Sequence, residues 1–271
     1  MRMNPSKHVL STVSLCLATA MAFWPVWRWY GLRTIDGSDE PWGVAALAVA
    51  LCVSYWRRGQ RVSISGRSVL IMGVIVSGYA ALYPHLPMLI LACLACAAVW
   101  VGVRGIYPSA HLGLPFLVLL ILSLPLMATL QFYLGYPMRW ATAFGATAML
   151  DMGSIPVTRL GLTLVCQGEQ VLIDAPCSGI RMLWTGAFLS ASLAHALKFK
   201  TLKTVALGAA AFALVLAGNV VRAAWIFLEA TGRLDQPAWM HKGAGVVVFA
   251  LLGWGVMCLA FRMDRRVPCS A

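Results

Sequence analysis

Residues 203–228 read KTVALGAAAFALVLAGNVVRAAWIFL. A helix that crosses the hydrocarbon core of a bilayer needs about 20 predominantly apolar residues, and this stretch is long enough. Over the whole 271-residue chain, 61% of the residues are hydrophobic and 11% are charged, against about 25% charged in a typical soluble protein. This composition excludes an ordinary soluble domain, and it excludes disorder. We therefore predict a single all-α, polytopic integral membrane domain over residues 1–271.

Seven further stretches approach the length of a span, which predicts about eight transmembrane helices in all. One of them is short, and two neighbours are separated only by a tight turn at Pro84-His85-Leu86-Pro87, where proline ends a helix. The seven stretches lie near residues 9–27, 41–56, 68–84, 86–103, 112–135, 178–197 and 243–261.

The first apolar stretch has two interpretations. It follows Arg2 and Lys7 and contains Ala18-Thr19-Ala20, which is similar to the cleavage site of a secretory signal peptide. It also continues through Trp24 and Trp27, which are typical of the interfacial anchors of a retained helix. We favour the retained helix and leave cleavage open, since cleavage would not change the sidedness of the later spans.

The charges predict the orientation of the chain. When the loops are assigned alternately to the two sides, one side receives thirteen cations and one acid, and the other side receives eight of each. The formal net charge of +12 therefore lies on one face. The positive-inside rule makes that face cytoplasmic, with both termini in the cytoplasm. The membrane that we expect is a bacterial inner membrane. The cations flank the spans and form no separate basic domain, so we expect no nucleic acid as a partner.

One loop, residues 136–177, is long and lies on the predicted extracytoplasmic side. Its first half, 138–152, contains Trp140 and Phe144 and predicts a helix lying at the membrane interface. Its second half, 157–173, carries apolar residues around Gln167-Gly168-Glu169, which predicts two short strands and a turn. This small interfacial helix and β-hairpin would precede the sixth span.

The loop ends in Asp174-Ala175-Pro176-Cys177-Ser178-Gly179-Ile180-Arg181, directly before that span. This turn places the thiol of Cys177 at the N-terminus of a helix, where the dipole favours a thiolate. We therefore expect a lowered pKa for Cys177. Two other interpretations stay open: a buried, inert thiol, and a disulfide between Cys177 and Cys166.

Two polar residues lie inside the stretch quoted first. Arg222 follows Asn219 by three residues, so the two share one helical face, and an arginine inside a span is costly without a partner. His241 opens the last span after a short loop, which places it near the same extracytoplasmic end. Arg222 could also snorkel to the interface, and His241 could be a simple interfacial residue.

Together these residues fit nucleophilic acyl transfer. The reaction needs a thiolate, a base that accepts and returns a proton, and a donor for the developing oxyanion. Cys177, His241 and Arg222 can supply these functions, with Arg181 and Asn219 as supports. The chain lacks the zinc-protease, serine-hydrolase and nucleotide-binding motifs, and no carboxylate lies inside a span. We expect neither a metal nor a cofactor.

The stretch from Asp174 to Arg181, then Asn219-Val220-Val221-Arg222, then His241 before a final span, resembles the exosortase/archaeosortase family. The resemblance is clearest over residues 160–262. It implies that Cys177 is the nucleophile and that Arg222 and His241 are its partners. It also implies cleavage, through a thioester, of C-terminal sorting signals of the PEP-CTERM kind, each a short motif, a transmembrane helix and a basic tail on a secreted protein.

In that family the acyl group is passed to an acceptor nucleophile, whose identity the sequence leaves unknown, as it does the recognised motif. The alternative is a multispan transporter or assembly factor for exopolysaccharide export, without enzymatic activity. In that case Arg222 and Asn219 would line a polar pathway. Membrane lipid is an expected partner under either interpretation.

Overall fold

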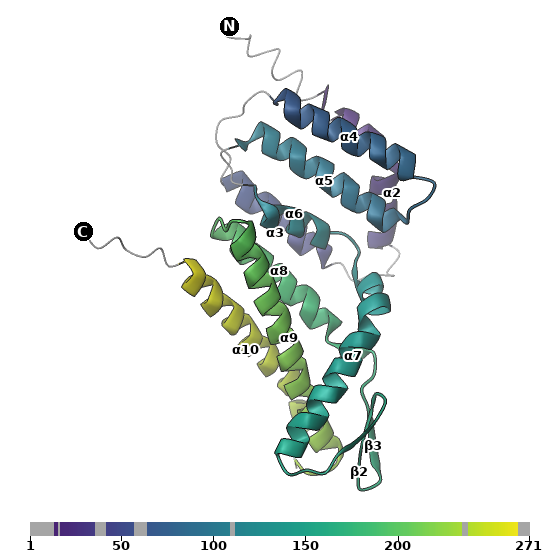
Figure 1. Ribbon diagram of the computed structural model, residues 1–271, viewed down its shortest axis with the longest axis vertical. Coiled ribbons are helices and arrows are strands. Elements are labelled where there is room, and N and C mark those ends of the chain that lie inside the picture. Colours follow the sequence, from purple (N-terminus) through teal and green to yellow (C-terminus); the bar gives the residue numbers. More distant parts are fainter. Residues whose placement is uncertain are drawn as a thin grey trace, which may run out of the picture. The chain divides into compact units, whose positions relative to one another are not determined.

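The computed structural model describes residues 14–15, 17–35, 42–56, 64–108, 112–234 and 238–264, with the backbone alone at 238–242 and 244. The described chain forms helices and one small sheet (Figure 1). It divides into two compact units, Met1–Pro125 with Ala194–Thr201, and Leu126–Leu193 with Leu202–Ala271. A single domain over residues 1–271 stays a prediction.

The first unit is helical. Helix α5 packs against α2, α4 and α6, and α3 packs against α6. Its core contains Phe23, Leu91 and Leu119, which are fully buried. The helices are α2 (Trp24–Ile35), α3 (Gly43–Trp56), α4 (Gly66–Leu82), α5 (Met88–Ile106) and α6 (Leu114–Leu122).

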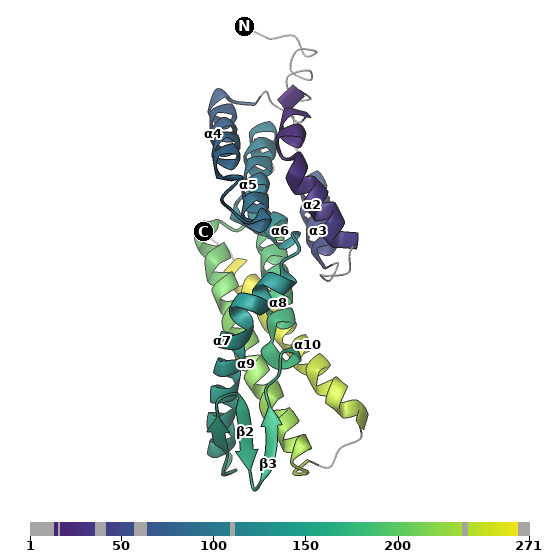
Figure 2. The ribbon, with the colours of Figure 1, turned by 90° about the vertical axis from the view of Figure 1, so that its right-hand side faces the viewer.

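The second unit joins long helices to the sheet, and α7 contacts strands β1 and β2 (Figure 2). A Cβ atom at Gly145 of α7 would lie 2.6 Å from the side chain of Val220 in α9, so only glycine lets these two helices approach this closely. The elements are α7 (Met127–Met152), β1 (Thr158–Leu160), β2 (Thr163–Cys166), β3 (Glu169–Leu172), the 3₁₀ turn η2 (Pro176–Ser178), α8 (Ile180–Ala196), α9 (Thr201–Ala230) and α10 (Ala238–Asp264).

Helix α9 carries a continuous buried stripe along one face. Residues four apart in an α-helix share a face, and this spacing recurs along the stripe from the first turns to the last. Asn219 is the polar member of this stripe, and its side chain is 1% exposed. The stripe consists of Leu207, Ala211, Val215, Asn219, Ala223 and Phe227.

The sheet confirms the predicted hairpin and adds a strand to it. Strands β2 and β3 pair antiparallel across a turn in which Gln167 has φ 51° and Gly168 has φ 90°. Strand β1 extends the sheet antiparallel to β2, through a second turn at Gly161. Leu164 and Cys166 of β2 alternate inward and pack against α7 and α9.

The number of spans is lower than predicted within the described residues. Three helices are long and apolar enough to cross a membrane: Met88–Ile106, Thr201–Ala230 and Gly245–Asp264. A fourth span is reached if α6 and α7 are counted as one broken span. Helices α3 and α4 are shorter apolar helices. The prediction of eight transmembrane helices is therefore not confirmed.

The break between α6 and α7 corrects two predictions. The stretch 112–135 is not one straight span, because α6 ends at Leu122 and α7 begins at Met127 after a bend of 99°. Pro125 lies in the break, and proline disfavours helical backbone at the residue before it. The predicted interfacial helix at 138–152 is the second half of α7, which runs on through Pro137 without interruption.

Part of the first predicted span lies outside the described residues, which exclude 1–13 and 16. Residues 17–22 are helical, and α2 follows from Trp24 after a turn at Phe23. The question of signal-peptide cleavage stays open.

Candidate active site around Cys177

The segment between β3 and α8 carries Cys177 in a turn of its own. The backbone N–H of Cys177 donates to the backbone carbonyl of Asp174 at 3.1 Å and to its carboxylate at 3.2 Å. Gly179, with φ 76°, then turns the chain into α8. Cys177 thus precedes α8 by three residues instead of opening it, and Asp174 takes the N–H group that was expected to face an anion.

A buried amide fixes this turn to two helices. The Nδ2 atom of Asn219 in α9 donates to the backbone carbonyl of Cys177 at 3.0 Å and to the hydroxyl of Thr142 in α7 at 2.8 Å. A Cβ atom at Gly179 would lie 2.9 Å from the side-chain amide of Asn219. The position therefore requires glycine for two reasons, its left-handed backbone and its close approach to Asn219.

A second polar contact ties the same turn to the start of α7. The hydroxyl of Ser178, which is 2% exposed, donates to Oε1 of Gln131 at 3.0 Å. The backbone N–H of Ile180 donates back to the Ser178 hydroxyl at 3.4 Å. Sequence reasoning did not single out Gln131, Thr142 or Ser178. The available signal was a glutamine and a threonine in largely apolar surroundings, where an unpaired polar group is costly.

The surroundings of the Cys177 thiol shift its pKa in the direction opposite to the one expected from the sequence. Burial raises the pKa of Cys177 above its ordinary value, and a hydrogen bond with the Asp174 carboxylate and its negative charge raise it further. The positive charge of Arg222 acts in the opposite direction and lowers the pKa. The prediction of a lowered pKa is therefore wrong. The half-buried thiol is protonated at neutral pH in this arrangement, so a nucleophilic role requires a base.

Arg222 lies close to α10 and acts electrostatically on Cys177. It follows Asn219 by almost one turn of α9 and is half-buried. Its Nε atom lies 3.6 Å from the place that a Cβ atom of Gly245 would occupy, so α10 presents Gly245 toward Arg222. The arginine is therefore beside α10 and near enough to the thiol for its charge to lower the pKa of Cys177.

His241 lies on α10, but its side chain is outside the described residues. It precedes Gly245 by four residues, and residues four apart lie on the same face of a helix, about 6 Å apart. The backbone therefore places His241 on the face of α10 that is turned toward Arg222. The convergence of the imidazole with the thiol stays a prediction.

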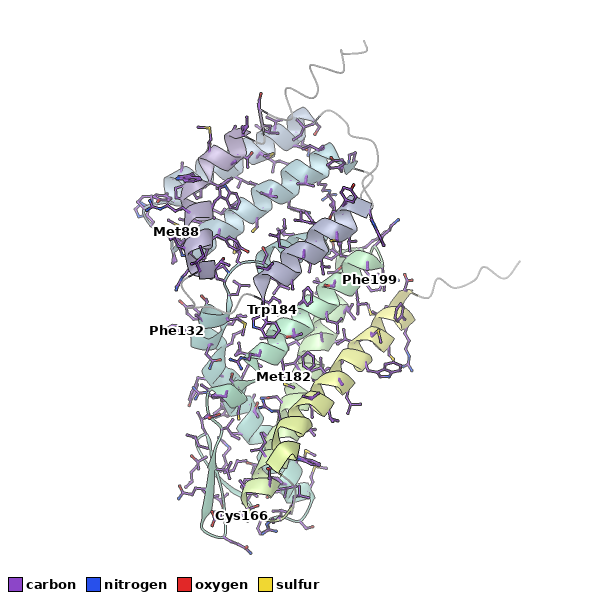
Figure 3. The ribbon with its side chains drawn as sticks, turned by 180° about the vertical axis from the view of Figure 1, so that it is seen from behind. Met88, Phe132, Cys166, Met182, Trp184 and Phe199 are labelled. Atoms are coloured by element: carbon purple, nitrogen blue, oxygen red, sulfur yellow. The ribbon has the colours of Figure 1, made fainter. Side chains whose placement is uncertain are left out.

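Two further sequence predictions have different outcomes. Arg181 lies in the first turn of α8, where it is exposed and where its backbone carbonyl accepts a hydrogen bond from Thr185. Its supporting role stays a prediction. The alternative of a disulfide is wrong, since Cys166 and Cys177 are both free thiols. Cys166 instead accepts a hydrogen bond at 3.4 Å from Arg233, and Figure 3 shows it at the sheet end of the second unit.

The described residues contain no cluster of three or more His, Cys, Asp or Glu side chains that could hold a metal ion. The groups that the described structure gathers around Cys177 are an amide, a guanidinium, a carboxylate and hydroxyls. This set can hold a thiol in place and stabilise a negative charge beside it.

The close approach at Gly179 predicts a difference between two glycine substitutions. Gly161→Ala lowers the free energy of unfolding by about 1–2 kcal/mol, because Gly161 has φ 66° and nothing within 4 Å of an added Cβ atom. Gly179→Ala lowers it by about 1–3 kcal/mol more, because the added methyl group also overlaps Asn219. Denaturant unfolding in detergent micelles measures both variants. Equal losses of unfolding free energy in the two variants would show that the close approach of Gly179 to Asn219 does not contribute to stability.

The carboxylate beside the thiol predicts a second effect. Asp174→Asn removes a charge and a hydrogen bond that raise the pKa of Cys177, so that pKa falls and alkylation at neutral pH becomes faster. The measurement is the rate of iodoacetamide modification of Cys177 against pH, followed by peptide mass spectrometry. Glu169→Gln on the exposed β3 strand is the matched control and leaves the profile unchanged. A slower or unchanged rate in Asp174→Asn would contradict this account of the thiol.

Comparison with known proteins gives one match. A family model described as "transmembrane exosortase" matches residues 8–258, which covers most of both units and includes the Cys177 turn, Asn219 and Arg222. No curated protein and no solved structure matches the chain. The chain, with its apolar helices and its Cys177 turn bound to α7 and α9, belongs to the transmembrane exosortase family.

Proposed function

We propose that this protein is a membrane cysteine protease or transpeptidase in which Cys177 attacks a peptide carbonyl of an exported protein. The observation that carries the proposal is the buried anchoring of the Cys177 turn by Asn219, with Arg222 close enough for its charge to act on the thiol. A nucleophile must be held in a productive position, and this turn is held from two helices. The match to the exosortase family supports the same chemistry.

The proposed reaction begins with proton transfer. The thiol proton of Cys177 passes to the imidazole of His241, and the sulfur adds to the substrate carbonyl carbon. Arg222 stabilises the oxyanion that develops on the carbonyl oxygen. The peptide C–N bond then breaks, the leaving amine takes the proton from the imidazolium, and a thioester remains on Cys177.

A second nucleophile resolves this thioester. An amine from an acceptor gives transpeptidation, and water gives hydrolysis, with the Cys177 thiol released in both cases. The proposed substrates are secreted proteins that end in a short motif, a transmembrane helix and a basic tail. A substrate anchored in this way brings its motif to the membrane surface. The charge asymmetry of the loops supports an extracytoplasmic site with both termini in the cytoplasm.

The contacts of Asn219 favour this enzyme over a transporter or assembly factor. A polar pathway would need the amide to be available to a passing solute. Asn219 is instead 1% exposed, and its Nδ2 atom donates two hydrogen bonds inside the bundle. These contacts support a structural role for Asn219 at the Cys177 turn.

The nucleophile is tested by substitution and trapping. Cys177→Ala and Cys177→Ser abolish cleavage of a co-expressed exported protein that carries a C-terminal helix and basic tail, while the variant stays inserted and abundant. Cys258→Ala, which removes a thiol from α10, is the matched control and retains cleavage. The measurement is the size of the substrate, together with mass spectrometry of any acyl group on Cys177. Normal cleavage by Cys177→Ala would end the proposal.

The base is tested by its pH dependence. His241→Ala slows cleavage by roughly 10²–10⁴-fold at neutral pH, which is the usual contribution of general acid–base catalysis. Because the pKa of Cys177 is raised, the residual rate climbs as the pH rises and the thiolate forms unaided. The rate of cleavage against pH measures this, with His85→Ala, at the exposed turn between α4 and α5, as the control. A pH-independent loss, or none, would assign the proton transfer to another group.

A further inference from the structure

A cavity in the first unit is lined by cations. Its volume is about 600 Å³, and it lies between the end of α5 and the loop that leads into α9. Arg104 comes from the last turn of α5, and Lys198 and Lys200 come from that loop. None of the described residues that line it is acidic. The cavity therefore concentrates positive charge from two segments that are distant in the sequence.

The cations are held by the local structure. The guanidinium of Arg104 lies over the ring of Trp100, 5.5 Å from its centre. Phe199 is 6% exposed, and its backbone N–H donates to Ala194 at 2.9 Å, while Lys198 takes φ 57°. The buried Phe199 thus pins the loop and leaves the lysines on either side of it exposed. Helix α9 begins at Thr201, so the positive end of its dipole adds to the charge.

A second, apolar cavity adjoins the first. Its volume is about 690 Å³, and it is lined by residues 51–56 of α3 together with Val103, Tyr107 and Leu112. Leu112 also lines the cationic cavity, so the two cavities share a wall residue. Val103 and Tyr107 line the apolar cavity, and Trp100 and Arg104 line the cationic one. Val103, Arg104 and Tyr107 follow Trp100 by three, four and seven residues, so both cavities are lined from the same face of the α5 segment.

We propose that the two cavities together bind one anionic phospholipid of the surrounding membrane. Its phosphate contacts Arg104, Lys198 and Lys200, and one acyl chain occupies the apolar cavity beside Cys52 and Val103. Basic pockets beside membrane helices on the cytoplasmic side suit such headgroups, and burial of each CH₂ group of the chain adds affinity. The charge asymmetry of the loops predicts that these three cations lie on that side.

The positive-inside rule alone does not account for this arrangement. It predicts which side of the membrane the cations occupy, but not that they converge on one cavity beside an apolar one. Arg67 and Arg262 are also exposed cations predicted on the same side, and neither is among the residues described as lining the two cavities. They therefore serve as matched controls for the lysines. The proposal uses no part of the Cys177 site.

The first experiment locates the lipid on the full-length protein in vesicles. A phosphatidylglycerol with a photoreactive group in its acyl chain is expected to label peptides that contain residues 51–56 and 103–107. A phosphatidylcholine probe with the same chain labels them much less. Lys198→Gln with Lys200→Gln lowers phosphatidylglycerol labelling by roughly fivefold for each lysine removed. Arg67→Gln with Arg262→Gln leaves it unchanged. Equal labelling by the two lipids, or equal losses in the two double variants, would overturn the proposal.

The second experiment separates a lipid site from a phosphate site. Millimolar inorganic phosphate is expected not to displace bound phosphatidylglycerol, since the ion lacks the acyl chain. Cys52→Trp fills the apolar cavity and lowers the amount of phosphatidylglycerol that stays bound in native mass spectrometry. Displacement by inorganic phosphate, or full lipid retention in a folded Cys52→Trp protein, would overturn the assignment of the apolar cavity to an acyl chain.

Discussion

One buried amide determines the position of the Cys177 turn. The chain between β3 and α8 contains only the short 3₁₀ turn η2, so its buried backbone polar groups need partners from elsewhere. Asn219 meets this need for the Cys177 carbonyl and binds Thr142 at the same time. The arrangement works only with glycine at position 179, because a side chain there would overlap the amide.

The same helix also sets the charge near the thiol. Arg222 lies almost one turn beyond Asn219 on α9. The hydrogen bond from Asn219 to the Cys177 turn therefore also determines where along α9 the Arg222 guanidinium lies relative to that turn. The thiol then experiences two opposed influences, since burial and Asp174 raise its pKa and Arg222 lowers it. Burial and Asp174 prevail in this arrangement. A thiol that is protonated at rest needs a base, and His241 on α10 is the residue proposed for that role.

For the cations of the first unit too, the sequence pattern predicts less than the structure shows. In the sequence, Arg104, Lys198 and Lys200 predict only which side of the membrane their loops occupy. In the structure they surround one cavity, because the buried Phe199 ties their loop to α8 and Trp100 lies beneath Arg104. An adjoining apolar cavity then gives this cluster the division between polar and apolar surfaces that a phospholipid has.

Local patterns in the sequence were enough to indicate apolar helices and a β-hairpin around Gln167-Gly168, and to single out Cys177, Arg222 and Asn219 as candidate site residues. These features depend on hydrophobic length, turn chemistry and the cost of polar groups in lipid, all of which act over a few residues. The tertiary structure alone decided the bend between α6 and α7, the third strand, the contacts of Gln131 and Thr142, and the direction of the pKa shift at Cys177. The reason is physical: a periodic pattern states which face of a helix is buried, but hydrogen-bond partners and electrostatic shifts are set by whichever distant segment packs against that face.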